Sequence, residues 1–187
     1  MLTTPRLLLR RWQSSDLAPF ARLNADPEVR RYFPNLLTRQ ESDASVERFE
    51  RHIEHHGFGF WAAELRETGA FIGFIGLDTT DFEPLFPAVE VGWRLTQEFW
   101  GNGYATEGGR EALRYGFETL ALEEIVSLTA VENRRSRAVM ERLGMTHDPQ
   151  DDFDHPALPA GHALQRHVLY RISKAHWRSR AAASEIA

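Results

Sequence analysis

A glycine-containing loop between a strand and a helix constrains this chain more than any other feature. The sequence WGNGYATE occupies residues 100–107, after an apolar run and before an amphipathic one. The first turn of a helix exposes backbone N–H groups without helical partners, at the positive end of the helix dipole. Glycines at 101 and 103 let the backbone approach a ligand closely. The stretch therefore predicts a site for phosphate or pyrophosphate.

Two well-known phosphate motifs do not fit this loop. A P-loop ends in Gly-Lys-Ser/Thr, and residues 100–107 contain no lysine. A Rossmann fingerprint follows the first strand and opens a series of βαβ units, which this loop does not. A plain connection, with Thr106 as the helix N-cap, stays open as an alternative.

The remaining pattern predicts a mixed α+β chain. A Glu-Thr-Gly turn at 67–69 joins two apolar runs as an antiparallel hairpin, and the segment 89–131 is long enough for one parallel βαβ crossover. We expect strands at 6–12, 58–65, 70–77, 89–95, 125–131 and 164–172. We expect helices after Ser14 and Ser15, after Asp26-Pro27, from the Thr38-x-x-Glu41 capping box to Gly57, after FWGNGYATEGG as far as about Leu120, and from near Ser136 to Leu143.

Length and composition narrow the class of protein. The 187 residues predict one domain (1–187), with its core at about 3–175 and a frayed tail at 178–187. A net charge of −5 gives no general attraction for nucleic acid. Cysteine is absent, which excludes thiol nucleophiles and thiolate metal sites. We expect no membrane partner and a cytoplasmic location, because no apolar run approaches about 18 residues and the N-terminus lacks signal-peptide features.

Taken together, three segments carry a resemblance to a known family. WGNGYATEG at 100–108, Asn133-Arg134-Arg135-Ser136 and Arg142-Leu143-Gly144-Met145 resemble the GNAT N-acetyltransferase superfamily, most of all its ribosomal-protein N-terminal acetyltransferase branch. TPRLLLRRWQSSDL, DPEV and VEVGW extend the similarity over about residues 3–175. The resemblance implies a mostly antiparallel sheet, flanked by helices, in which the fourth and fifth strands are parallel and splay apart.

The resemblance also implies acetyl-CoA as co-substrate, and no metal. The loop amides from Gly101 to Thr106 would hold the CoA pyrophosphate, and the backbone of 93–95 would bond to the pantetheine arm. Asn133 would contact CoA or the loop, although it could simply cap the next helix. The implied CoA-binding residues are Trp93, Arg94, Leu95, Trp100, Gly101, Asn102, Gly103, Tyr104, Ala105, Thr106 and Asn133.

The implied reaction is direct attack of a neutral primary amine on a thioester. A base must remove a proton from the ammonium form first. Glu90 is the candidate base, with a solvated outward carboxylate as the alternative. Ser136 is the candidate proton donor to the leaving thiolate, with N-capping as the alternative. Many family members have a tyrosine acid where Met140 stands here, and methionine cannot donate a proton.

The acceptor stays open between a small-molecule amine and a protein N-terminus. A homodimer is an expectation from the family. Two other functions remain: a non-catalytic CoA- or nucleotide-binding module, and an acyltransferase using a longer donor such as succinyl-CoA.

We expect His52 and His56 to form a solvated helix end rather than a metal site. We expect core positions, with some walls of the acceptor pocket, at Phe33, Phe58, Phe60, Trp61 and Phe86.

Overall fold

The computed structural model describes residues 1–80, 82, 85 and 87–185, and the chain divides into two compact units. Unit 1 contains residues 1–78 and 92–112, and unit 2 contains residues 79–91 and 113–187. Three elements continue from one unit into the other: β4 (Phe71–Thr80), β5 (Ala88–Leu95) and α3 (Tyr104–Glu118). Among the described residues, no helix has the length and apolar character that crossing a bilayer requires.

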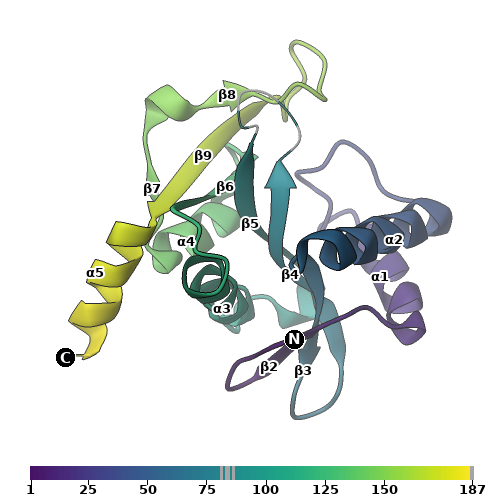
Figure 1. Cartoon of the computed structure of the whole chain (residues 1–187). Coiled ribbons are helices and arrows are strands. Elements are labelled where there is room, and N and C mark those ends of the chain that lie inside the picture. Colours follow the sequence, from purple (N-terminus) through teal and green to yellow (C-terminus); the bar gives the residue numbers. More distant parts are fainter. Residues whose placement is uncertain (81, 83–84, 86, 186–187) are drawn as a thin grey trace. The chain divides into compact units, whose positions relative to one another are not determined.

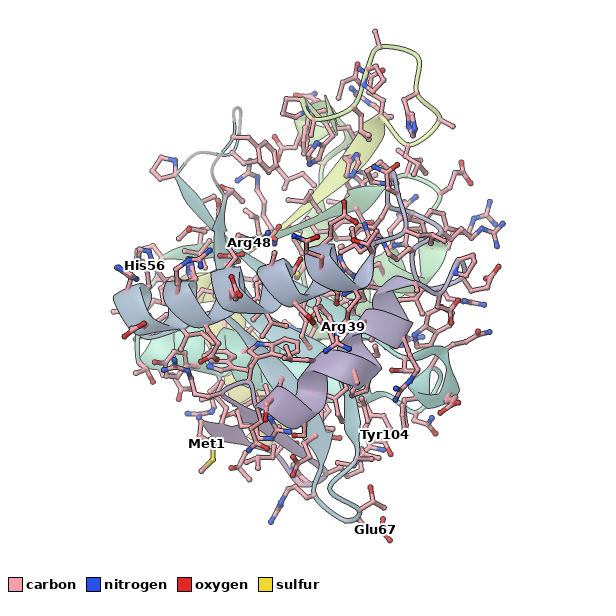
Figure 2. The ribbon with its side chains drawn as sticks, turned by 90° about the vertical axis from the view of Figure 1, so that its right-hand side faces the viewer. Met1, Arg39, Arg48, His56, Glu67 and Tyr104 are labelled. Carbon is pink, nitrogen blue, oxygen red and sulfur yellow. The ribbon has the colours of Figure 1, made fainter. Side chains whose placement is uncertain are left out.

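Unit 1 is built on antiparallel strands in the order β1-β2-β3-β4, with β5 next to β4. The hairpin predicted around Gly69 joins β3 to β4, and Glu67 lies at its tip (Figure 2). Helices α1 and α2 lie side by side (Figure 1). The other elements are β1 (Leu2–Thr3), β2 (Leu7–Arg10), β3 (Phe60–Leu65), α1 (Leu17–Asn24), α2 (Arg39–His56) and the short 3-10 helices Ser14–Asp16 and Gln97–Phe99.

Helix α2 forms where the capping signals predict it. Glu41 N donates to Thr38, and the Glu41 side chain accepts from the Thr38 backbone, which completes the capping box. Gly57 ends the helix in the left-handed conformation, at φ 76°. The buried face carries Val46, Phe49 and Ile53 at spacings of three and four.

The helix expected after Asp26 is wrong. Asp26 Oδ1 accepts from the backbone N of Glu28 at 2.8 Å, as an N-cap would, but residues 27–32 form turns only. Val29 and Arg30 are the buried residues of this segment, so no apolar stripe supports a helix. Arg30 Nε instead donates to the carbonyl of Asn35, which fixes the chain in a turn.

A buried ion network joins β2 to the chain before α1. The Arg10 guanidinium donates to both oxygens of Asp16, at 2.7 and 2.9 Å, and its Nε donates to Glu64 at 2.7 Å. Asp16 is 2% exposed and also accepts from the backbone N of Gln13. The 3-10 turn Ser14–Asp16 has Gln13 as its N-cap and α1 has Asp16, so neither Ser14 nor Ser15 caps a helix here.

Unit 2 contains the parallel strand pair. β5 and β6 are in register at Glu90 and Val126, and β6 pairs antiparallel with β9. Strands β7 and β8 both lie along β9 (Figure 1). The mixed α+β class, the mostly antiparallel pairing and the parallel crossover are confirmed. The elements are β6 (Glu124–Ala130), α4 (Arg134–Leu143), β7 (Thr146–His147), a 3-10 turn (Pro149–Asp151), β8 (Phe153–Asp154), β9 (Arg166–Ser173) and α5 (Lys174–Glu185).

The C-terminal segment differs from the expected frayed tail. Helix α5 extends from Lys174 to Glu185, and residues 186–187 lie outside the described chain. The Trp177 ring packs against Phe117 of α3 at a centroid distance of 5.8 Å. This aromatic contact anchors the first turn of α5 within unit 2.

Two histidines of unit 2 that pack against each other predict that the folded state loses stability at acidic pH. The rings of His155 and His167 lie 4.9 Å apart, and burial lowers the pKa of both below the ordinary value of about 6.5. The folded state keeps them neutral, while the unfolded chain takes up protons near pH 6.5. Stability therefore falls as pH decreases through this window, by up to about 1.4 kcal/mol per histidine per pH unit.

Urea unfolding at pH 7.5 and 5.5 measures this effect. We expect a lower midpoint at pH 5.5, and a smaller difference between the two pH values in His167→Phe. The exposed His176 provides the matched control, His176→Phe. An equal pH dependence in all three proteins would contradict the assignment.

Candidate functional site

The loop before α3 presents a row of unpaired backbone amides. Gly101 and Gly103 have φ values of 79° and 81°, and α3 begins at Tyr104. The amides of residues 101–106 donate no hydrogen bond to any described residue, and the first backbone bond comes from Glu107 N to Gly103 O at 2.9 Å. Thr106 lies inside the helix, so the alternative that it serves as N-cap is wrong. Successive amides in alternating conformations form an anion-binding concavity.

Side chains of the loop hold its own backbone. Trp100 Nε1 donates to the carbonyl of Leu95 at 2.8 Å, which ties the loop to the end of β5. Asn102 Nδ2 donates to the carbonyls of Phe99 and Trp100, at 3.3 and 3.2 Å. These contacts leave the amides of 101–106 available, because the side chains bond to carbonyls only.

A carboxylate of α3 clamps the N-terminal strand region beside this loop. Glu107 accepts from Thr4 Oγ1 at 2.6 Å, from Arg6 N at 2.9 Å and from Arg6 Nε at 2.6 Å. Burial opposes ionisation, but the hydrogen bonds from Thr4 and Arg6 outweigh it and lower the pKa of Glu107. Arg6 Nη1 also donates to the carbonyl of Asn102 at 3.0 Å, and its guanidinium lies over the Tyr104 ring.

The second half of β5 is fixed by close backbone contact with β4. Gly73 has a φ of 136°, and a Cβ at that position would collide with the carbonyl of Arg94 and the Cα of Leu95. Thr96 N donates to the carbonyl of Ile72 at 2.9 Å. The backbone of Trp93, Arg94 and Leu95, expected to contact pantetheine, therefore has a defined path in unit 1.

The other predicted residues belong to unit 2. Glu90 is half-buried on β5, at the register pair with Val126. Asn133 Oδ1 accepts from Ser136 N at 3.3 Å, so Asn133 caps α4 and Ser136 lies in its first turn. The N-cap alternative is thus confirmed for Asn133 and wrong for Ser136. Asn133 Nδ2 also donates to Thr129 Oγ1 at 2.9 Å.

Of the two histidines expected at a solvated helix end, His52 is packed against its neighbours. His52 Nδ1 lies 3.1 Å from Asp78, and its ring stacks on His56 at 4.4 Å. Burial lowers the pKa of His52 despite the nearby Asp78 carboxylate. No cluster of three or more metal-ligating side chains occurs in the described parts of the chain.

The aromatic residues that were expected in the core or at the acceptor pocket differ in their exposure to solvent. Phe58, Phe60 and Trp61 are buried in unit 1. The Phe60 ring lies 4.7 Å from Phe74 and belongs to the aromatic core between α2 and the sheet. Phe33 is one of three large hydrophobic residues exposed among the described residues, at 37%. Phe86 lies outside the described residues.

Comparison with known proteins places this geometry in a family. The family model described as "Acetyltransferase (GNAT) domain" matches residues 6–146, which is more than half of the chain. The chain is 32% identical over 145 residues to protein YkkB of Bacillus subtilis, covering 77% of this chain and 84% of that protein.

Solved structures agree on the fold. An acetyltransferase of Agrobacterium tumefaciens gives a TM-score of 0.74 at 31% identity, over 91% of this chain and 92% of that one. The spermidine N-acetyltransferase of Vibrio cholerae, solved with CoA and spermine, gives 0.72 at 22% identity, over 92% and 98%. On the family match and the fold, this chain belongs to the GNAT acetyltransferases and is an acetyl-CoA-dependent N-acyltransferase.

Proposed function

We propose that this protein transfers an acetyl group from acetyl-CoA to a primary amine by direct attack within a ternary complex. The observation that carries the proposal is the row of amides at residues 101–106, which donate to no described acceptor at the start of a 15-residue helix. Such a row suits a pyrophosphate, because the amides and the helix dipole both favour negative charge.

The other predicted residues have separate proposed roles. The backbone of 93–95 holds the pantetheine arm, and Asn133 contacts the co-substrate in addition to capping α4. Acetyl-CoA supplies an activated acetyl thioester. Glu90 removes a proton from the ammonium group, directly or through water, so that the amine nitrogen gains a free lone pair. A backbone N–H of β5 stabilises the charge that develops on the acetyl oxygen, and Ser136 donates a proton to the departing thiolate.

Replacing Glu90 with glutamine tests the base. We expect kcat to fall by about 10²–10⁴-fold, because the amide cannot accept the proton, while the Kd of acetyl-CoA stays unchanged. The comparison with Glu98→Gln, an exposed carboxylate in the 3-10 turn Gln97–Phe99, controls for the charge change. Parental activity of Glu90→Gln across pH 6–9 would remove Glu90 from this role.

Calorimetric titration with acetyl-CoA, succinyl-CoA and CoA tests the proposal as a whole. Saturable binding of acetyl-CoA, followed by thiol release with amines, supports it. Tighter binding and faster turnover of succinyl-CoA than of acetyl-CoA would identify succinyl-CoA as the acyl donor. CoA binding without thiol release from any amine or peptide N-terminus would indicate a non-catalytic module, and no binding of any CoA species would overturn the proposal.

The acceptor panel follows from the family. It contains small-molecule amines, among them the spermidine that names the Vibrio cholerae structure, and peptides with free N-termini, which represent the ribosomal-protein branch. Thiol release with peptides alone would favour that branch, and release with small amines alone would exclude it.

A further inference from the structure

A half-buried arginine side chain leaves β5 at the segment proposed to hold pantetheine. Arg94 Nη1 donates to Asn24 Oδ1 at 2.8 Å, and its guanidinium lies 4.1 Å from the ring centroid of Phe33 and 5.2 Å from that of Phe74. All these residues belong to unit 1. The two rings and the amide fix the plane of the guanidinium, and one edge has no partner among the described residues.

The unpartnered edge is formed by Nε and Nη2. Nε is buried and has no hydrogen-bond partner, and Nη2 forms none with the described residues. No carboxylate within the described ranges forms an ion pair with Arg94. A buried cationic donor without an acceptor is costly, because nothing replaces the hydrogen bond to water that burial removes. The Nε–Nη2 edge of arginine has the spacing of two carboxylate oxygens.

Two further arginines increase the positive charge at this place. Arg30 lies over the same Phe33 ring, at 4.8 Å from its centroid, and Arg48 extends from α2 (Figure 2). Burial first, and then the charges of Arg30 and Arg48, lower the pKa of Arg94 to about 9. The negative charge of Glu41 raises the pKa of Arg30, but burial lowers that pKa more. The Glu41 carboxylate is also engaged in the capping box of α2. The cluster of Arg30, Arg48 and Arg94 thus favours an anion and disfavours a polycation.

We propose that the Nε–Nη2 edge of Arg94, supported by Arg30 and Arg48, binds a carboxylate of the acceptor, so that the substrate is a primary amine that also carries a carboxyl group. This inference rests on the proposed function. The side chain starts from the strand segment that holds the pantetheine arm, so a carboxylate held there lies beside the arm. The exposed Phe33 ring covers the guanidinium and is the group that must shift when the acceptor enters.

A matched acceptor series tests the inference without any variant. Thiol release is measured with α-, β- and γ-amino acids, with the carboxamide of each, and with spermine. We expect a KM at least tenfold lower for one amino acid than for its carboxamide, and the poorest kcat/KM for spermine. Equal KM values for acids and carboxamides, or a preference for spermine, would overturn the inference while thiol release still supports the proposed function.

The variant Arg94→Gln tests directly whether Arg94 is the residue that binds the acceptor carboxylate. We expect its KM for the carboxylate-bearing amine to rise at least tenfold, with little change for the carboxamide and for the Kd of acetyl-CoA. Arg51→Gln, an exposed arginine of α2, is the matched control. A weaker acetyl-CoA Kd in Arg94→Gln would assign the arginine to the co-substrate instead and overturn the inference.

Binding of the reaction product provides a readout independent of turnover. With CoA present, calorimetry compares the N-acetylated amino acid with its carboxamide, in the parent protein and in Arg94→Lys, which keeps the charge but loses the planar edge. We expect the parent to bind the acid at least tenfold more tightly, and Arg94→Lys to lose most of this preference. No preference in the parent would contradict the proposal even if Arg94→Gln failed to fold.

Discussion

Gly103→Val is expected to reduce the affinity for acetyl-CoA by at least about 100-fold. Gly103 has a φ of 81°, and a Cβ there would meet only Arg6 Nη2, at 3.5 Å, so the obstacle is torsional and not steric. A β-branched residue avoids this region, and the loop must rotate to relieve the strain. Each amide that turns away from the pyrophosphate loses a charged hydrogen bond of about 1.5–3 kcal/mol, so two lost bonds exceed 100-fold.

Gly69→Val separates loss of binding from loss of stability. Gly69 has a φ of 71° in the β3–β4 turn, and a Cβ there would have no atom within 4 Å, so valine carries the same torsional strain away from the loop. We expect both variants to lose stability and only Gly103→Val to lose acetyl-CoA binding by calorimetry. A folded Gly103→Val protein with parental affinity would remove the loop from the site.

Asp16→Ala is expected to lower the free energy of unfolding by about 3–5 kcal/mol. The change leaves Arg10, which is 8% exposed, without its bidentate partner, and a buried charge that loses its counter-ion is strongly destabilising. It also removes the acceptor for the backbone N of Gln13. Glu64 remains on Nε and limits the loss, because the guanidinium keeps one carboxylate.

The matched control is an exposed pair of the same chemistry. Arg39 and Asp43 on α2 lie 2.8 Å apart with side chains 55% and 34% exposed, so Asp43→Ala should cost less than about 1 kcal/mol. Urea unfolding at pH 7.5 compares the two variants with the parent. If Asp16→Ala lost no more stability than Asp43→Ala, the buried network would not contribute as argued.

The parts of the fold that could be predicted from sequence are those fixed by neighbours along the chain. The Thr38–Glu41 capping box and the glycine of the β3–β4 turn satisfy backbone groups within four residues, so spacing alone identifies them. The segment after Asp26 shows the limit of this approach. A cap was present there, but too few apolar residues followed to pack a helix.

The candidate site was predictable only in its main chain. The Gly-Asn-Gly sequence indicates an amide row, because glycine freedom and helix start are local properties. The contacts of Glu107 with Thr4 and Arg6 join residues about a hundred positions apart, and no local spacing signals them. The same holds for Arg94, whose neighbours Asn24, Phe33 and Phe74 come from three separate segments.

The amide row has a consequence for mutational scanning of this protein and for its evolution. Alanine scanning truncates side chains, and an amide survives truncation, so a scan of positions 104 and 106 would leave the anion contacts in place. An anion site made of main-chain amides therefore tolerates side-chain changes at those two positions. It is lost at the two glycines, whose torsions no other common residue adopts at low cost.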